Sequence, residues 1–182
     1  LGSREFYSLQ FGTHPKALVP RPETELLVDM ALNLIPSHQP LRICDLGTGT
    51  GIIAITLKKE RPRTRVYATD VDAACIALAR ENASRHAVDI EWIEADWYRG
   101  LPASLEFDLI VSNPPYIAAG HPFLTQGDLP AEPRLALTPG VTGLEALQQI
   151  VAGAHRHLAA GGYLPLEHGY DQQTAVAELL AA

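Results

Sequence analysis

The sequence predicts a doubly wound, Rossmann-like α/β domain built on a mostly parallel sheet. From about residue 23 onward, short runs rich in strand-forming residues alternate with longer stretches of helical periodicity. A glycine-rich segment, residues 47–51, lies where the first of these runs passes into a helix. The alternation is typical of parallel strands covered by helices, and the expected order of the five strands across the sheet is 3-2-1-4-5. The length of 182 residues suits one such domain.

The first helix is expected directly after residues 21–24, because a proline suits a first turn and acidic side chains suit the positive end of a helix. Apolar residues then recur at helical spacing until Pro36 ends the pattern. Strands are expected over residues 41–46, 65–69, 90–94, 107–112 and 163–167, and further helices over residues 52–59, 73–85, 144–158 and from about residue 171.

Three segments depart from this regular alternation. Residues 1–7 alternate enough to form a small strand or hairpin. Residues 113–141 are rich in Pro and Gly without convincing periodicity, and because they follow a strand end we expect a functional loop. Pro165 falls inside the last expected strand, which predicts a position at the sheet edge because proline cannot donate a ladder hydrogen bond.

Composition disfavours several classes of protein. Apolar residues make up 47% and charged residues 19%, with a mean hydropathy near zero, so neither a disordered chain nor a membrane protein is expected. The formal charge of −7 disfavours binding to nucleic-acid phosphates. Cys44 and Cys75 lie in apolar surroundings and are expected to be buried thiols of a cytoplasmic protein. His155 and His157 are two positions apart on an expected helix, so they cannot face one ligand, and no metal site is expected.

The strongest local signal is the glycine-rich segment after the first strand. Glycines there let the backbone turn tightly and let a ligand lie against the main chain at a helix N-terminus. The spacing Gly-x-Gly-x-Gly differs from the dinucleotide pattern Gly-x-Gly-x-x-Gly, so a pyrophosphate ligand is less well supported. The residues of this candidate binding loop are Gly47, Thr48, Gly49, Thr50 and Gly51.

Acidic and aromatic residues follow the next two strands. Asp70 ends the second strand, where a carboxylate can accept hydrogen bonds from both hydroxyls of a ribose. An adenosine-type ligand without a 2′-phosphate is therefore expected. Asp72 is expected to cap the helix that follows. Asp96 and Trp97 can offer a carboxylate and an aromatic face to a purine, although Trp97 can also be a plain core residue.

The segment Asn113, Pro114, Pro115, Tyr116 ends the fourth strand. Two successive prolines fix the backbone and hold a carbonyl outward. That carbonyl and the side-chain oxygen of Asn113 form a pair of acceptors for one planar NH2 group, on which Tyr116 can stack. Amide and exocyclic amino nitrogens are poor nucleophiles, and holding both hydrogens favours the geometry in which the nitrogen lone pair faces an electrophile.

With these elements the sequence resembles the S-adenosylmethionine-dependent methyltransferases that carry Asn-Pro-Pro-Tyr. It looks most like the HemK/PrmC group, the N5-glutamine methyltransferases of peptide chain release factors. Asn-Pro-Pro-Tyr is shared with DNA adenine methyltransferases, whereas Arg-Pro-Glu-Thr at residues 21–24 is more particular to the release-factor group. The resemblance covers essentially the whole chain and rests on residues 4–7, 18–25, 45–51, 96–97, 113–116, 132–133, 136–137 and 166–169.

The resemblance implies a class I methyltransferase fold and a role for each motif. The methyl donor S-adenosylmethionine would be held by residues 47–51 together with Asp70, Trp97 and Asn113. The target glutamine would be held by Asn113, Pro114, Pro115 and Tyr116, of which Asn113, Pro114 and Tyr116 are expected to act in catalysis. Further candidates, expected to close over or line the donor site, are Pro22, Glu23, Thr24 and Asp96.

The resemblance also implies domain bounds and a reaction. Residues 1–21 would be a connecting segment with a small hairpin, left from an absent N-terminal helical domain, and residues 22–182 a methyltransferase domain incomplete at its C-terminal end. The expected reaction methylates the glutamine side-chain amide in the Gly-Gly-Gln (GGQ) loop of a class 1 release factor, in the cytoplasm, without membrane or direct nucleic-acid contact. Three alternatives stay open: a nucleic-acid adenine-N6 methyltransferase, a ribosomal-protein glutamine methyltransferase, and a nucleotide-binding domain without catalysis.

Overall fold

A five-stranded parallel sheet forms the centre of the structure, a computed structural model that describes residues 2–13, 21–127 and 129–181. The strands lie in the order β5-β4-β3-β6-β7, and every pairing between them is parallel. Counted from β3, this is the predicted order 3-2-1-4-5. The strands are β3 (Arg42–Leu46), β4 (Arg65–Asp70), β5 (Glu91–Glu94), β6 (Phe107–Val111) and β7 (Leu158–Tyr163).

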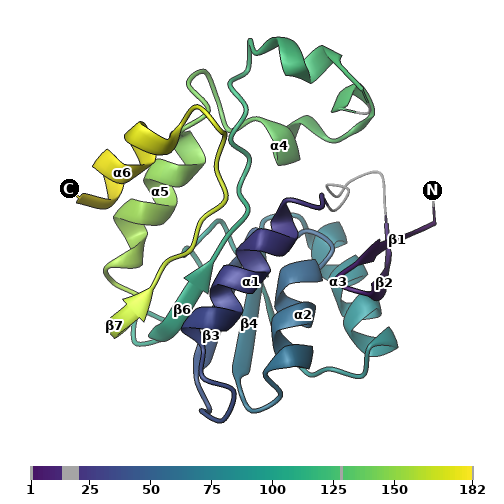
Figure 1. Cartoon of the computed structure of the whole chain (residues 1–182), viewed down its shortest axis with the longest axis vertical. Helices are drawn as coiled ribbons and strands as arrows, with labels where there is room; N and C mark the ends of the chain where they lie inside the picture. The colour runs from purple at the N-terminus through teal and green to yellow at the C-terminus, as the bar shows by residue number, and fades with distance from the viewer. Residues whose placement is uncertain (1, 14–20, 128, 182) are drawn as a thin grey trace.

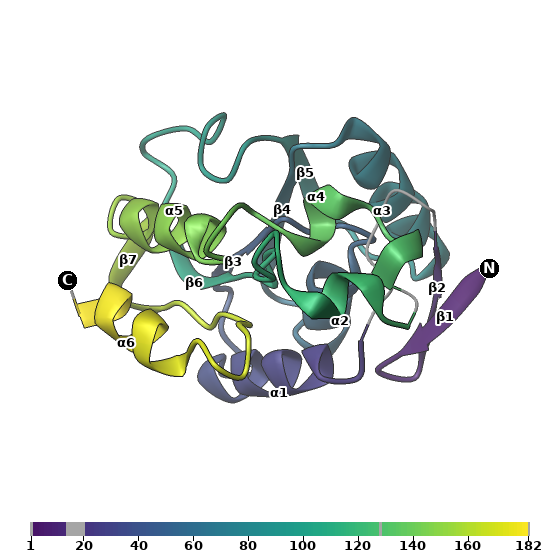
Figure 2. The ribbon, with the colours of Figure 1, turned by 90° about the horizontal axis from the view of Figure 1, so that it is seen from above.

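Helices cover both faces of this sheet (Figures 1 and 2). Successive strand residues point to opposite faces, so Ile43 and Leu109 pack in one core cluster and Cys44 and Ile110 in another. The first cluster includes the buried faces of α1 and α2, and the second includes Ile150 of α5. The longer helices are α1 (Thr24–Leu34), α2 (Ile52–Glu60), α3 (Ala73–Arg85), α5 (Glu145–Ala154) and α6 (Gln173–Ala181).

Helix boundaries near the strand ends follow the predicted capping signals. The Asp72 carboxylate accepts a hydrogen bond from the Ala74 amide at 2.8 Å, which confirms the predicted N-cap of α3. Helix α1 ends at Leu34, with the extended residue Ile35 in front of Pro36, as the restriction on residues before proline predicts. The Asp72 cap therefore marks the start of α3 after β4, and Pro36 marks the end of α1 before β3.

A two-stranded hairpin precedes the sheet; the strand or hairpin predicted within residues 1–7 is its first strand, and the second strand extends to Gly12. Strands β1 (Ser3–Phe6) and β2 (Leu9–Gly12) pair antiparallel. Tyr7 and Ser8 form the turn with φ of 51° and 59°, the left-handed conformation that a two-residue type I′ turn requires. Phe6 and Phe11 are buried in the core cluster of α1 and α2. Of the motif residues, Leu18, Val19 and Pro20 lie outside the described residues.

The last strand and the helix before it correct the sequence prediction. Helix α5 ends at Ala154 instead of residue 158, and β7 spans Leu158–Tyr163 instead of residues 163–167. The helix was predicted too long because the apolar residues after Ala154 continue its helical spacing. The strand was predicted too late because the Gly-Gly pair inside β7 is more typical of a loop. Pro165 therefore lies beyond β7, where only its carbonyl is used, accepting from the Ser112 amide at 3.3 Å. Strand β7 is an edge of the described sheet, and a bulge interrupts its pairing with β6.

The two neighbouring histidines also lie elsewhere than predicted. His155 and His157 follow α5 in a turn, so they are not on a helix. The His157 ring stacks on Tyr98 with centroids 5.1 Å apart, and its Nδ1 atom lies 2.9 Å from the Leu105 carbonyl oxygen. His157 is thus a packed core residue.

The long loop, described at residues 113–127 and 129–141, folds over the carboxyl ends of the strands (Figure 1). It contains two 3-10 turns, η1 (Pro122–Thr125) and η2 (Leu129–Ala131), and the short helix α4 (Arg134–Leu137). Backbone hydrogen bonds from Ile117 to Leu137 (3.0 Å) and from Ala119 to Gly140 (2.8 Å) close the loop on itself. The loop therefore covers the edge of the sheet at which the strands end.

Candidate active site

A cavity of about 600 Å³ lies at the carboxyl ends of the central strands, beneath the long loop. A doubly wound sheet opens a crevice at this edge, where the strand order reverses between β3 and β6. Its volume is in the range of small-molecule sites. The expected site residues that line it are Thr24, Gly47, Thr48, Gly49, Thr50, Asp70, Asp96, Trp97, Asn113 and Pro115.

The glycine-rich turn forms one wall of this larger cavity. Gly47, Gly49 and Gly51 all have left-handed φ, at 71°, 56° and 82°. At Gly51 an added Cβ would lie 3.0 Å from the Ala79 side chain, so a side chain is excluded by space as well as by conformation. The turn leads directly into α2 at Ile52, so its backbone N–H groups lie at a helix N-terminus.

The buried side chain of Asp45 holds the glycine-rich turn by hydrogen bonds. Its Oδ2 atom accepts hydrogen bonds from the Thr48 hydroxyl at 2.6 Å and from the Ala54 amide at 3.2 Å. The side chain is fully buried, and this burial raises the pKa of its carboxyl from 3.8 to about 7. Asp45 thereby ties the turn to the first turn of α2, a role that the sequence analysis did not assign.

Asp70 joins the turn to the end of β4. Its Oδ2 atom accepts from the Gly49 amide and its Oδ1 atom from the Asp72 amide, both at 2.9 Å. A carboxylate offers about four lone-pair positions, so the backbone amides that contact Asp70 do not use all of them. Burial raises the pKa of Asp70, and hydrogen bonds from the backbone amides of Asp72, Gly49 and Val71 oppose that shift. The residue therefore fits the predicted contact with two ribose hydroxyls.

Trp97 lies against the turn from the side of β5. An added Cβ at Gly47 would be 3.2 Å from its ring, so the indole packs directly on the bare backbone there. Trp97 itself has φ of 53°, a conformation that is uncommon for a bulky side chain. The ring also packs against the core cluster of α5, so both the aromatic wall and the core role apply. The neighbouring Asp96 carboxylate lies 3.6 Å from the Arg99 guanidinium.

Asn113 stands at the end of β6 with a defined side-chain orientation. Its Nδ2 atom donates to the Thr24 hydroxyl at 3.0 Å. Because the nitrogen is committed to Thr24, the amide oxygen is left as an acceptor for another group. Ser112, just before it, donates through its hydroxyl to the Leu46 carbonyl at 2.6 Å and holds the strand end against β3.

A second, smaller cavity of about 60 Å³ lies on the other side of Asn113. Asn113, Pro115 and Ala136 line both cavities, so these residues form a shared wall. The smaller cavity is otherwise lined by Arg21, Pro114, Tyr116, Ile117, Leu129, Leu137 and Glu167.

Tyr116 is held at both ends within the smaller cavity. Its hydroxyl donates to Glu167 Oε1 at 3.1 Å, and its carbonyl accepts from Gln172 Nε2 at 2.9 Å. Burial raises the pKa of Tyr116, and the nearby Glu167 charge adds to that shift. Burial also raises the pKa of Glu167, while the polar groups of Thr24, Tyr116 and Asn113 oppose the change. Polar contacts therefore connect four residues beside the wall between the two cavities: Thr24, Asn113, Tyr116 and Glu167.

An ion pair fastens the long loop to the segment before α1. The Arg21 guanidinium pairs with the Glu132 carboxylate, which is almost fully buried. Arg21 lines the smaller cavity, and Glu132 follows η2 in the loop. The pair thus connects the long loop to a residue that lines the smaller cavity.

Comparison with known proteins places this site in a family. Residues 23–127 match the family described as "Methyltransferase small domain". The chain is 49% identical to the release factor glutamine methyltransferase of Burkholderia pseudomallei, over 100% of this chain and 66% of that protein. It is 47% identical to the release factor glutamine methyltransferase of Bordetella pertussis, over 99% of this chain and 67% of that protein. The chain belongs to the release factor glutamine methyltransferase family. It spans about two thirds of the length of these relatives.

The fold of this family member also matches solved methyltransferase structures. A 16S rRNA methyltransferase of T. thermophilus, solved in complex with AdoMet and guanosine, superposes with a TM-score of 0.71. The two chains are 18% identical, and the match covers 99% of this chain and 45% of the other. At this identity the likeness concerns the fold alone, and it confirms the Rossmann-like methyltransferase fold predicted from the sequence.

The two cavities divide the expected site residues of this family member. Most expected donor residues line the larger cavity, and Pro114 and Tyr116 line the smaller one. Three expected residues line neither cavity: Gly51, Pro22 and Glu23. Gly51 is part of the glycine-rich turn and precedes α2, whereas Pro22 and Glu23 form the turn that begins α1. Among the described residues, no helix has the length and apolar character needed to cross a membrane. The same residues hold no cluster of three or more His, Cys, Asp or Glu suited to a metal ion.

Three residues of the site received no role from the sequence. Asp45 stands at the start of the glycine-rich motif, and its burial beneath the turn is a tertiary feature. Glu167 belongs to a motif that supported the resemblance, yet its contact with Tyr116 spans 51 residues. Gln172 lies in the turn before α6 and carries no local signal at all.

Proposed function

We propose that this chain transfers a methyl group from S-adenosylmethionine to the side-chain amide nitrogen of a glutamine in the GGQ loop of class 1 peptide chain release factors. One observation carries the proposal: two cavities of different size meet at a wall made by Asn113 and Pro115. A donor and an acceptor held on the two sides of this wall would meet at the Asn113 amide. The names of the curated relatives support the same activity.

The larger cavity suits the methyl donor. S-adenosylmethionine supplies a methyl group bonded to a positively charged sulfur. Asp70 would accept hydrogen bonds from the ribose hydroxyls, because its carboxylate keeps unused acceptor positions beside the Gly49 amide. The Trp97 ring offers an apolar face next to the bare backbone of Gly47. The acidic side chains of Asp70 and Asp96 favour a cation in this cavity.

The smaller cavity suits a glutamine side chain. The Asn113 oxygen, left free because its nitrogen donates to Thr24, would accept one N–H of the target amide. The Pro114 carbonyl would accept the other, and the Tyr116 ring would pack on the amide plane. As the new N–C bond forms, the bond between the methyl group and the donor sulfur would break and S-adenosylhomocysteine would leave. Positive charge would develop on the amide nitrogen, and the two oxygens would stabilise it until one of the two amide protons leaves to solvent, giving N5-methylglutamine.

The charge of the chain favours a protein over a nucleic acid as substrate. A formal charge of −7 gives no general attraction for phosphates. Because the curated relatives are named for release factors, we infer that the partner is the release factor itself, met in the cytoplasm where translation ends, without direct nucleic-acid binding.

The proposal is tested by following a labelled methyl group. The chain is incubated with methyl-labelled S-adenosylmethionine, a class 1 release factor, a ribosomal protein fraction and adenine-containing DNA in one mixture. Peptide mass spectrometry and nucleoside analysis then locate the label. We expect label on the GGQ glutamine alone, and at least about a hundredfold less with Asn113→Ala, because one of the two oxygens facing the amide is lost.

Other outcomes contradict specific parts of the proposal. Label on adenine would overturn the substrate while keeping the chemistry, and label on a ribosomal protein would overturn the partner. Donor binding without transfer to any acceptor would leave a nucleotide-binding domain and overturn the enzymatic function.

A further inference from the structure

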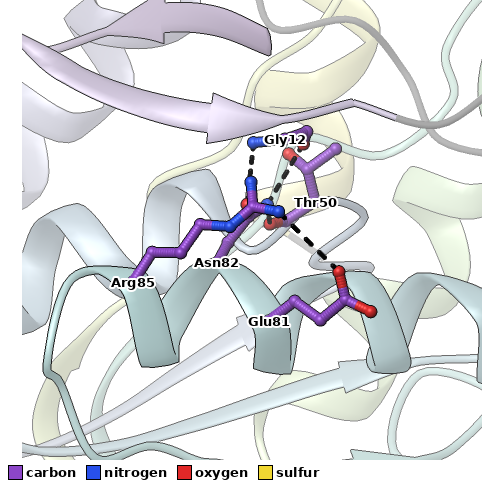
Figure 3. Close-up of polar contacts among 5 residues, drawn as sticks. All are labelled: Gly12, Thr50, Glu81, Asn82 and Arg85. Carbon is purple, nitrogen blue, oxygen red and sulfur yellow. Dashed lines mark hydrogen bonds and ion pairs between the residues drawn. The ribbon is translucent and has the colours of Figure 1, made fainter. Parts of the chain in front are cut away.

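A buried asparagine outside both cavities links the hairpin to the glycine-rich turn. Asn82 lies in α3 and is fully buried. Figure 3 shows its amide between the end of the hairpin and the Thr50 carbonyl. Buried side-chain amides that make all their hydrogen bonds to backbone groups fix those backbone segments relative to one another.

On one side, Asn82 pairs with the last residue of the hairpin. Its Oδ1 atom accepts from the Gly12 amide at 2.8 Å, and its Nδ2 atom donates to the Gly12 carbonyl at 3.2 Å. The side chain thus replaces a strand partner for Gly12. The approach is close, because an added Cβ at Gly12 would lie 2.7 Å from Arg85 Nη1 and 3.1 Å from Asn82 Oδ1.

On the other side, Asn82 holds the turn that lines the larger cavity. The Nδ2 atom donates to the Thr50 carbonyl at 2.9 Å. The neighbouring Gly49 amide donates to Asp70 at 2.9 Å, so the turn is fastened from β4 on one flank and from α3 on the other. Thr50 and Asp70 both line the larger cavity.

The inner face of α3 runs continuously between these two places. Cys75 lines the larger cavity, and four residues later Ala79 lies against Gly51. Asn82 follows one turn further and reaches the hairpin. Residues spaced by three or four positions share one helix face, so α3 is a rigid connection between cavity and hairpin.

We propose that Asn82 is a positioning residue for the donor-binding turn, and that through it the hairpin and the donor site affect each other. This rests on the proposed function, because it takes S-adenosylmethionine as the occupant of the larger cavity. Moving the hairpin away from Asn82 removes two of the three hydrogen bonds that fix its amide, so the amide holds the Thr50 carbonyl less firmly and donor binding weakens. By linkage, a bound donor must in turn steady the hairpin. A protein that touches the hairpin can therefore change donor affinity without touching the donor.

The test measures the affinity of the whole chain for S-adenosylmethionine by calorimetry. Asn82→Asp keeps an acceptor for the Gly12 amide but places an oxygen against the Thr50 and Gly12 carbonyls. We expect its Kd for the donor to rise by about tenfold, because a buried donor is replaced by an acceptor. Gly12→Ala places a methyl group 3.1 Å from Asn82 Oδ1, which is tighter than ordinary contact, while the flexible end of Arg85 can move aside. The substitution strains the link between Gly12 and Asn82 without altering the turn itself, and a rise of about threefold in the donor Kd is expected. The double variant is expected to be no weaker than Asn82→Asp, since both changes break one link.

Two control variants separate positioning from general destabilisation. Glu81→Gln alters the exposed neighbour on the same helix, and Ile90→Val removes one buried methyl group from the core cluster that the hairpin shares. Both are expected to keep the donor Kd within about twofold of the wild type. A donor Kd for Asn82→Asp equal to that of these controls would overturn the positioning role.

Hydrogen exchange in the wild type tests the coupling without any substitution. The Phe11 and Gly12 amides are expected to exchange more slowly when S-adenosylmethionine is bound. Unchanged exchange, or additive effects of Asn82→Asp and Gly12→Ala, would overturn the coupling. Failure of the wild type to bind S-adenosylmethionine is a different result, visible before any variant is made, and it would overturn the proposed function together with this inference.

Discussion

Thr24 decides which end of the Asn113 amide faces the smaller cavity. Its hydroxyl accepts from Asn113 Nδ2 at 3.0 Å and is almost completely buried. Without that hydroxyl the amide nitrogen loses its Thr24 partner and keeps only its interaction with Glu167, and the amide can turn so that nitrogen instead of oxygen faces the substrate. Because the orientation of the Asn113 amide depends on this hydroxyl, replacing Thr24 by the nearly isosteric Val is expected to have a large effect on methyl transfer.

We therefore expect Thr24→Val to lower the single-turnover rate of methyl transfer by about tenfold or more, the cost of one misplaced hydrogen bond in a transition state. Thr24→Ser keeps the hydroxyl and is expected to retain most of the rate. Equal rates for the Val and Ser variants would show that Thr24 does not orient Asn113.

The Asp45 carboxyl predicts a dependence of stability on pH. Burial raises its pKa from 3.8 to about 7, so the folded chain holds this proton more tightly than the unfolded chain does. The contribution of Asp45 to stability is fully present below about pH 4 and is lost as the pH rises to about 7, because the unfolded chain loses the proton first. The substitution Asp45→Asn keeps an acceptor for the Thr48 hydroxyl and removes the titratable carboxyl group.

Urea unfolding at pH 5 and pH 8 measures this contribution. Between these values the free energy of unfolding of the wild type is expected to fall by about 3 kcal/mol more than that of Asp45→Asn. Parallel pH profiles for the two proteins would mean that Asp45 keeps an ordinary pKa.

At the scale of elements, an ion pair joins the long loop to the segment before α1. Arg21 precedes α1 and Glu132 follows η2, and their pairing brings the two segments together beside the smaller cavity. Losing the guanidinium removes that partner from a carboxylate that is almost fully buried, which is costly for a group of this kind.

We expect Arg21→Ala to raise the KM for a GGQ-containing release factor by about fivefold, because the loop that shapes the acceptor cavity is released. The Kd for S-adenosylmethionine is expected to stay unchanged, since Arg21 does not line the larger cavity. Arg21→Lys keeps the charge and should recover part of the loss. A change confined to the donor Kd would contradict this account of the loop.

The elements that were predictable from sequence are those with a strong period or a cap. Strands β3 to β6 and helices α1 to α3 lie within two residues of their expected bounds, because buried parallel strands read as apolar runs and Asp72 marks a helix start. Strand β7 was misplaced because its Gly161 and Gly162 lack strand propensity and its pairing with β6 is bulged. Tertiary pairing at an edge overrides propensity there.

At the scale of the whole molecule, motif residues were predictable and their supports were not. The glycine-rich turn, Asp70 and Asn113 each end a strand, and the parallel topology brings such ends to one edge of the sheet. The contacts of Glu167 with Tyr116 and of Asn82 with Gly12 cross 51 and 70 residues. Contacts of this range depend on how helices and loops pack, which one sequence does not encode in a local pattern.

The central claim is that a donor and a glutamine occupy two cavities divided by Asn113 and Pro115. A crystal structure of the chain with S-adenosylhomocysteine and a Gly-Gly-Gln peptide tests it most directly. The account predicts the adenosine ribose at Asp70 in the larger cavity and the glutamine amide in the smaller one, with its nitrogen facing the Asn113 side-chain oxygen. A glutamine side chain bound in the larger cavity, or a nucleoside bound away from Asp70, would contradict it.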